Sequence, residues 1–248
     1  PEQLVAAEAL ARRAAAVAEE VPLPVVACQT WQLLGALRRS QDPAEATACL
    51  ERARRLAVRH DLPIEEIHAL IRLGNDDALR DASLDRLEQV RLEASRVGAV
   101  TTRYQAEASL ALQAILRADF DKAEALLDGV LAATTRLNLL ETVRYALLLR
   151  TMLGAHRGRR REMDAALVEL RRWAGDHAQH TLRVYGLARA WCALLEEQRP
   201  RALAELSCAL RAEERSPTIF QLTGRYGLHL LLRVVDGASG PAEYQATT

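Results

Sequence analysis

One pattern of apolar residues recurs five times along the chain and limits the folds that it can adopt. In the clearest copy, Ala123, Leu127 and Val130 lie at i, i+4 and i+7, which places them on one face of an α-helix. The residues equivalent to Ala123 follow one another at intervals of 36 to 43 residues; they are Ala46, Ser83, Ala166 and Ala202. A period of this length indicates stacked pairs of helices, because a single pair cannot bury its apolar face.

Each repeat predicts a first helix (helix A), a short turn, a second helix (helix B) and a short link. Proline suits the first turn of a helix, and aspartate or serine suits the residue that caps it. The expected breaks carry such residues; they are Asp42-Pro43, Asp61-Leu62-Pro63, Gly98, Asp119, Gly158, Gly175-Asp176, Pro200 and Ser216-Pro217. The small residues Gly35, Ala111 and Gly154 are expected where two helices cross closely.

The predicted fold is therefore all-α: a tetratricopeptide-like (TPR-like) helix-pair solenoid of about eleven to twelve helices, wound as a right-handed superhelix. The A helices are expected to line its inner, concave wall. Residues 1–248 are expected to form a single helical-repeat domain. Within it, residues 2–20 would be the orphan B helix of a preceding repeat, 218–235 a final A helix and 236–248 a loose tail. Because the chain begins at Pro1 without a methionine, it is expected to be a fragment of a larger protein.

Composition agrees with packed helices. Half of the residues are apolar but only 4% are aromatic, so the core must be built mainly from Leu, Ala and Val. The formal net charge is zero, whereas nucleic-acid binding usually requires a basic excess. The chain shows no signal peptide and no apolar run of the ~18 residues that span a bilayer, so a cytoplasmic location is expected. Lys122 is the only lysine among 33 basic residues, which is typical of a GC-rich, actinobacterial genome.

Several stretches resemble one bacterial family. Trp31, Leu34 and Gly35, and also Leu153-Gly154, are similar to the TPR signature. The longer stretches are similar to actinobacterial large ATP-binding LuxR-type transcriptional regulators, over residues 25 to 235; they are ACLERARRLAVRHDLP, ALIRLG, RADFDKAEALLDGVL, MLGAHRGRRREMDAAL and ALLEEQRPRALAEL.

The resemblance implies a P-loop ATPase domain before the helical repeats and a LuxR-type helix-turn-helix after them. It also implies that the repeats receive an inducer or a partner protein and transmit its binding to those domains. The chain itself contains no GxxxxGK[ST] motif, and Lys122, in FDKAE, cannot serve one. This chain alone is therefore expected neither to hydrolyse ATP nor to bind DNA, and no cofactor is expected.

Two clusters of acidic and histidine residues have spacings that suggest metal sites. The segment NDDALRD contains Asp76, Asp77 and Asp81, but a DDxxD site for Mg²⁺-diphosphate needs an acid where Arg80 stands. A helix end before Ser83 is the favoured interpretation. The cluster Asp176, His177 and His180 has spacing suited to a transition metal, but an ordinary cap at a helix start is favoured.

Other polar groups suggest weaker possibilities. A basic turn could contact phosphate or an acidic domain, although its neighbouring acids Glu162 and Asp164 favour a solvated loop; it consists of His156, Arg157, Arg159, Arg160 and Arg161. His60, His68 and His229 lie in helical patterns without a nucleophile at suggestive spacing, so no catalytic residue is predicted.

The wall of A helices is the predicted binding groove. It would change from polar to apolar along the chain, with Trp191 as a stacking platform. Its predicted residues are Gln29, Gln32, Arg39, Gln105, Leu112, Ile115, Leu148, Thr151, Val184, Trp191 and Leu194. The alternative is that these residues simply pack between A helices.

Three functions follow as hypotheses. The first is the sensor arm of a LuxR-type regulator, which binds a small-molecule inducer or a protein partner. The second is a stand-alone TPR-type adaptor for protein–protein interaction. The third, a helical isoprenoid-type enzyme, is not expected to be active. A fragment with exposed repeat ends could also form a homodimer, because its truncated apolar faces have lost their neighbours.

Overall fold

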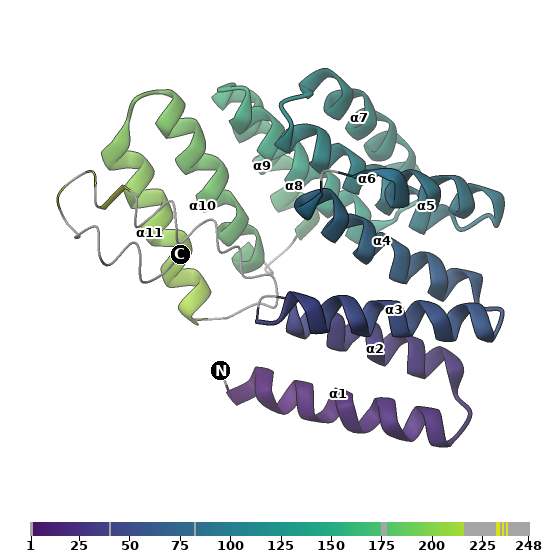
Figure 1. Ribbon diagram of the computed structural model, residues 1–248. Helices are drawn as coiled ribbons and strands as arrows, with labels where there is room; N and C mark the ends of the chain where they lie inside the picture. Colours follow the sequence, from purple (N-terminus) through teal and green to yellow (C-terminus); the bar gives the residue numbers. More distant parts are fainter. Residues whose placement is uncertain are drawn as a thin grey trace. The chain divides into compact units, whose positions relative to one another are not determined.

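The computed structural model describes residues 2–39, 41–81, 83–174 and 178–215, together with residues 232, 233, 235 and 237. Over these residues it contains eleven α-helices and no strand, which confirms the all-α prediction (Figure 1). The helices are α1 (Glu2–Glu20), α2 (Pro24–Arg38), α3 (Pro43–Arg59), α4 (Pro63–Arg80), α5 (Asp85–Arg96), α6 (Val100–Leu116), α7 (Phe120–Arg136), α8 (Leu140–His156), α9 (Arg160–Ala174), α10 (Ala178–Leu195) and α11 (Arg199–Arg215). The expected final A helix at 218–235 and the tail at 236–248 lie almost entirely outside the described residues.

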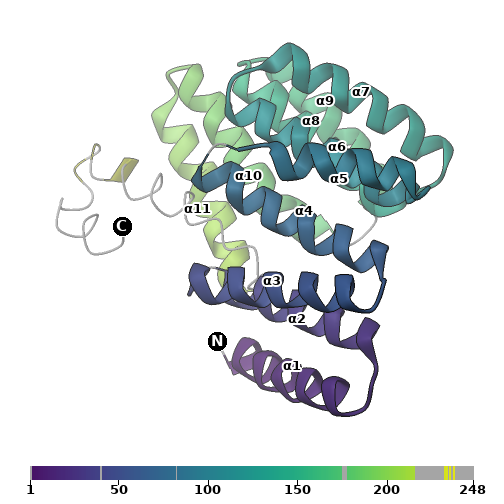
Figure 2. The ribbon, with the colours of Figure 1, turned by 45° about the vertical axis from the view of Figure 1, so that its right-hand side comes forward.

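Helices that follow one another in sequence pack against one another. The chain divides into two compact units, Pro1–Leu110 and Ala111–Thr248, and α6 runs through the boundary. In the first unit α1 packs on α2, α2 on α3, α3 on α4 and α4 on α5, as both views show (Figures 1 and 2). In the second unit α7 packs on α8, α8 on α9 and α10 on α11, while α10 also contacts α8. This is the consecutive helix-pair packing of a helical solenoid.

The predicted breaks fall between helices where they can be observed. Pro24, Pro43 and Pro63 each begin a helix, and the Asp42 side chain accepts a hydrogen bond from the Glu45 amide at 2.9 Å. Asp119 caps α7 by accepting from the Lys122 amide. The breaks at Gly175-Asp176 and Ser216-Pro217 lie outside the described residues.

Six of the described helices end in the same left-handed turn. In each, a residue with positive φ donates its N–H to the carbonyl three residues back, and the next residue donates to the carbonyl five residues back. The residues with positive φ are Asp61, Gly98, Ala118, Asn138, Gly158 and Glu197. This turn reverses the chain within about three residues and so makes each helix pack antiparallel to the next.

Glycine permits the closest contacts between helices, as the sequence predicts for Gly35 and Gly154. A Cβ atom added at Gly154 of α8 would lie 2.7 Å from the backbone nitrogen of Met163 in α9. One added at Gly35 of α2 would lie 2.8 Å from Cγ of Leu50 in α3. Within the described part of the chain, no helix is long and apolar enough to cross a membrane.

Candidate functional site

The A helices carry the predicted binding residues. The A helices of the first repeats are α2, α4 and α6, and those of the later repeats are α8 and α10. The structure shows which of the predicted residues lie together within each unit and which are buried in helix packing.

Gln29 and Gln32 of α2 both contact one buried carboxylate on α4. Their Nε2 atoms donate to the two oxygens of Glu65, each at 3.0 Å. Glu65 is only 7% exposed, and Gln32 is 6% exposed. Because a carboxylate can only accept hydrogen bonds, both amides must turn their nitrogen atoms towards it. The predicted residues Gln29 and Gln32 are thus brought together by a residue that the sequence did not single out.

Beyond Glu65, a looser series of polar contacts continues to α6, without a hydrogen bond between Glu65 and His68. Nδ1 of His68 lies 3.9 Å from Oε2 of Glu65, and its Nε2 lies 3.4 Å from the hydroxyl of Thr102. Burial lowers the pKa of His68, while the nearby Glu65 carboxylate opposes that shift. Side chains of three successive A helices therefore form one polar chain across the first unit.

A second set of polar contacts joins the same helices about two to three turns further along. Arg39, the C-cap residue of α2, forms an ion pair with Asp76 of α4. The neighbouring Asn75 donates from Nδ2 to the Ser109 hydroxyl of α6 at 3.3 Å. We call the two sets together the polar ladder; it consists of Gln29, Gln32, Arg39, Glu65, His68, Asn75, Asp76, Thr102 and Ser109.

In the second unit the notable feature of the A helices is an aromatic stack. The His156 ring at the end of α8 lies 5.0 Å from the Trp191 ring of α10, at an interplanar angle of 18°. Trp191 remains 37% exposed, so one part of its ring can still meet a ligand. Burial lowers the pKa of His156. Trp191 is therefore partly a packing residue and partly an accessible surface.

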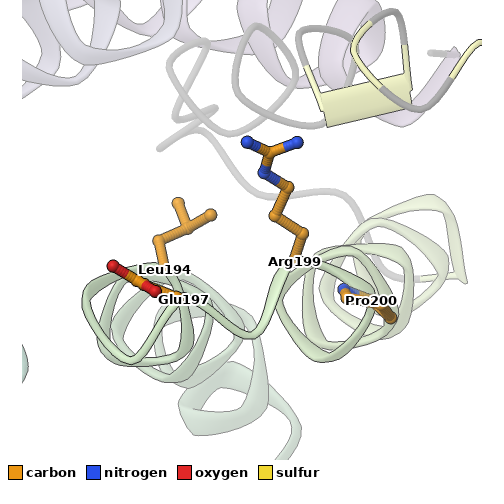
Figure 3. A pocket seen from close by; sticks show the side chains of 4 residues that line it. All are labelled: Leu194, Glu197, Arg199 and Pro200. Atoms are coloured by element: carbon orange, nitrogen blue, oxygen red, sulfur yellow. The ribbon is translucent and has the colours of Figure 1, made fainter.

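A shallow hollow lies close by, at the turn between α10 and α11. Figure 3 shows it between Leu194 at the end of α10, Glu197 in the turn that follows, and Arg199 and Pro200 at the start of α11. Leu194 is half-buried and also packs against the core between these two helices. The hollow combines one apolar side chain with one acid and one base, so it has no chemical specificity of its own.

The other predicted groove residues differ in accessibility. Ile115 and Thr151 are each 1% exposed, and the Thr151 hydroxyl donates to the Leu147 carbonyl of its own helix at 3.0 Å. Leu148 is half-buried against the core between α8 and α9. Gln105 and Leu112 are half-buried in α6. Val184 lies in α10, but its side chain is outside the described residues.

The acidic segment of α4 is neutralised by arginines. Asp76 pairs with Arg39, and Asp77 pairs with Arg80 at 3.2 Å and with Arg86 at 3.1 Å. Burial raises the pKa of Asp76, and the Arg39 charge counteracts this. No cluster of three metal-ligating side chains occurs among the residues that the structure describes. Asp176 and His177 lie outside them, as does the side chain of His180.

Two arginines of the basic turn after α8, Arg157 and Arg160, contact neighbouring helices, while Arg159 and Arg161 are exposed. Arg157 is held by Asp121 at 2.9 Å and Glu124 at 2.6 Å, both on α7. Arg160 forms a two-point contact with Glu196, directly after α10, at 2.6 and 2.7 Å. These pairs satisfy most of the positive charge that a phosphate would need.

Sequence reasoning missed Glu65, Thr102 and Ser109, yet one signal could have found them. The hydrogen-bonded partners of the polar ladder are separated by 33 to 36 residues, which is close to the shortest repeat interval of 36 residues. Polar residues that recur at this interval on A helices lie side by side in a stack of repeats.

Comparison with known proteins adds no family assignment. No protein-family model matches the sequence. No curated protein matches it with significant similarity.

Proposed function

We propose that this chain is the sensor arm of a LuxR-type transcriptional regulator, and that it binds a small-molecule inducer or a protein partner along its A helices. The observation that carries the proposal is the polar ladder, which joins α2 to α4 through the buried Glu65 carboxylate, joins α4 to α6 through other polar side chains, and leaves the Gln29 amide at the surface. The sequence resemblance supports the more specific assignment to a LuxR-type regulator. In this proposal the chain works in the cytoplasm, needs no cofactor, catalyses no reaction and leaves ATP and DNA to other domains.

The polar ladder offers a means of transmission. A ligand with hydrogen-bond donors can compete with Gln29 for the Glu65 carboxylate, and this would change the spacing of α2 and α4. Binding shifts an equilibrium between two arm conformations only by the difference between its affinities for them. A ligand that contacts two neighbouring A helices has such a difference, because its contacts depend on their separation.

The first test is the reading frame of the parent gene on both sides of residues 1–248. A P-loop ATPase upstream and a helix-turn-helix downstream are expected. If both are absent, the regulator assignment fails, and a stand-alone TPR-type adaptor becomes the better proposal.

The second test measures binding directly. Thermal unfolding of the chain is followed with candidate inducers and with amphipathic peptides; saturation at about 100 times Kd stabilises a protein by ~2.7 kcal/mol. A true ligand should lose this effect in Gln29→Ala or Trp191→Ala and keep it in Leu92→Ala, a control at a residue of α5 that is 62% exposed. Flat unfolding temperatures across the whole panel would count against the proposal, and stabilisation by peptides alone would favour the adaptor.

A further inference from the structure

Arg72 of α4 is the one charged side chain on the A helices of the first unit that makes no ion pair or hydrogen bond with a residue that the structure describes. The other charged side chains of α2, α4 and α6 in that unit have partners; Arg103, for example, pairs with Glu107 at 2.9 Å. Arg72 is also exposed to solvent. Its guanidinium therefore keeps all of its hydrogen-bond donors available.

The unpaired arginine lies in the middle of the polar ladder, between its two sets of contacts. Arg72 follows His68 by four residues and precedes Asp76 by four, so the three side chains share one face of α4. The ladder contacts on either side of it reach residues of α2 about 36 positions earlier in the chain. By the same register, Arg72 lies within one turn of Leu33 on α2.

The surroundings make this unmatched charge costly. Burial among the neighbouring helices lowers the pKa of Arg72, the Arg39 charge lowers it further, and Asp76 opposes both. Burial also lowers the pKa of His68, and the Arg72 charge adds to that effect. A side chain that solvent reaches but that other helices surround is only partly hydrated, and cations that lose water are normally paired. An anion beside Arg72 would replace the lost water and offset the repulsion from Arg39.

A spare amide lies at the same level on the next A helix. The two ladder contacts between α4 and α6 each join residues 34 apart, so Gln105, which follows Arg72 by 33 residues, lies beside it. Gln105 is half-buried, and its side chain has no hydrogen-bond partner in the part of the chain that the structure describes. Its amide can therefore donate to the same anion as Arg72.

The neighbouring face of α2 is apolar on both sides of one amide. Val26, Gln29 and Leu33 lie at i, i+3 and i+7, and Gln29 directs this face towards α4 by its contact with Glu65. Val26 is 44% exposed and Leu33 45%. An apolar group attached to the anion would be covered by these two side chains.

We propose that Arg72 anchors the anionic group, a carboxylate or a phosphate, of a small amphipathic ligand whose apolar body lies against Leu33 and Val26. The forked N–H groups of a guanidinium match two oxygens of either anion, and Gln105 supplies a further donor. The inference rests on the proposed function, because it names the chemical class of inducer that the A helices receive.

The test is isothermal titration calorimetry of the full chain at low ionic strength with four probes: octanoate, octyl phosphate, inorganic phosphate and octanol. Binding is expected for octanoate or octyl phosphate, and the stronger of the two identifies the anion. Octanol has the same apolar body without the charge, so it should bind at least ~tenfold more weakly. Inorganic phosphate should also bind more weakly, because it lacks the apolar body.

Variants of Arg72 locate the binding. Arg72→Met removes the charge and should weaken the stronger anion by at least ~tenfold, whereas Arg72→Lys keeps the charge without the fork and should give an intermediate affinity. The matched control is Arg55→Met, at an exposed arginine of α3, which should keep the affinity within about twofold because a distant surface charge is largely screened.

Three results would overturn the proposal: no binding of either amphipathic anion, equal binding of octanoate and octanol, or equal losses in Arg72→Met and Arg55→Met. A structural role for Arg72 is tested separately by urea unfolding without ligand. Arg72→Met should be at least as stable as the wild type, because the charge has no partner and methionine keeps an unbranched stem. A clear loss of stability would assign Arg72 to packing and also overturn the proposal.

Failure of this inference differs from failure of the proposed function. If neutral small molecules stabilise the chain while anions do not act through Arg72, the inference is wrong and the proposed function stands. If anions bind through Arg72 but the parent gene encodes neither a P-loop ATPase nor a helix-turn-helix, the anion site stands and the regulator assignment is wrong.

Discussion

The contact between α8 and α9 provides the sharpest test of the structure, through the variant Gly154→Ala. The added Cβ would lie 2.7 Å from the backbone nitrogen and 3.0 Å from Cα of Met163. Both are backbone atoms, so no side-chain rotation can relieve the overlap, and the two helices must move apart. Overpacking of this kind costs about 1–3 kcal/mol, and the upper half of that range is expected here.

A matched substitution isolates the packing cost. Gly129 lies in α7 of the same unit, and a Cβ added there meets no atom within 4 Å. Gly129→Ala should therefore stabilise the protein by ~1 kcal/mol through helix propensity alone. The same gain is present in Gly154→Ala, so the difference between the two free energies of unfolding equals the packing cost of about 2–3 kcal/mol.

The assay is urea unfolding followed by circular dichroism, with unfolding temperatures as a second measure. For a chain of this size, 1 kcal/mol corresponds to ~2–4 °C. Gly74→Ala should cost less than Gly154→Ala, because its added Cβ meets side-chain atoms of Leu87 at 3.0 Å, and a side chain can shift. If Gly154→Ala stabilises the protein as Gly129→Ala does, α8 and α9 do not approach as closely as described.

Three further perturbations test other parts of the structure. Ala118 has a φ of 60°, a left-handed backbone conformation that costs an alanine ~1–2 kcal/mol. Ala118→Gly should therefore stabilise the protein by up to ~1 kcal/mol, because the strain that is removed exceeds the entropy cost of glycine. Gly158→Ala, at a φ of 68°, should destabilise the protein in the same urea assay. Glu65→Leu should destabilise the protein by ~1–3 kcal/mol, because it leaves the buried Gln32 amide unpaired. The double variant Gln32→Leu/Glu65→Leu should be less destabilised, because both partners are then apolar. Additive losses of stability in this double-mutant cycle would contradict the hydrogen bond. Burial lowers the pKa of His156 from 6.5, so the unfolded chain takes up this proton first, and stability should fall as the pH drops from about 6.5 through the folded pKa. His156→Phe keeps an aromatic ring against Trp191 and should flatten that part of the pH profile; an unchanged slope would contradict the burial of His156.

The arrangement of helices was predictable because local rules determine it. Proline at the first position of α3 and α4, and glycine in left-handed turns at Gly98 and Gly158, mark helix ends by their backbone preferences alone. The turns at Ala118 and Glu197 were less readable, because neither residue favours positive φ. At these two turns the packing of consecutive helices imposes the positive φ, and it outweighs the preference of alanine and glutamate for negative φ.

The candidate site was only partly predictable. Gln29 and Gln32 could be assigned to an A helix from periodicity, but their partner Glu65 lies in the next repeat and is identified only when the repeats are stacked. Periodicity also placed Ile115 and Thr151 on the A-helix wall, whereas both are almost fully buried. A helical repeat assigns a residue to a face of its helix, and the tilt of the neighbouring helix determines how much of that face stays open.

In the first unit, polar contacts about one repeat apart occur between A helices and between B helices, but they are not equivalent. Arg12–Glu45 and Arg86–Glu51 join neighbouring helices through partly exposed groups, where an ion pair contributes little. The Glu65 carboxylate is buried, so loss of its donors is costly. The separation of α2 and α4 therefore depends more on Glu65 than on any exposed pair. It follows that a ligand that replaces Gln29 as a donor to Glu65 acts at the contact with the greatest effect on the spacing of two adjacent repeats.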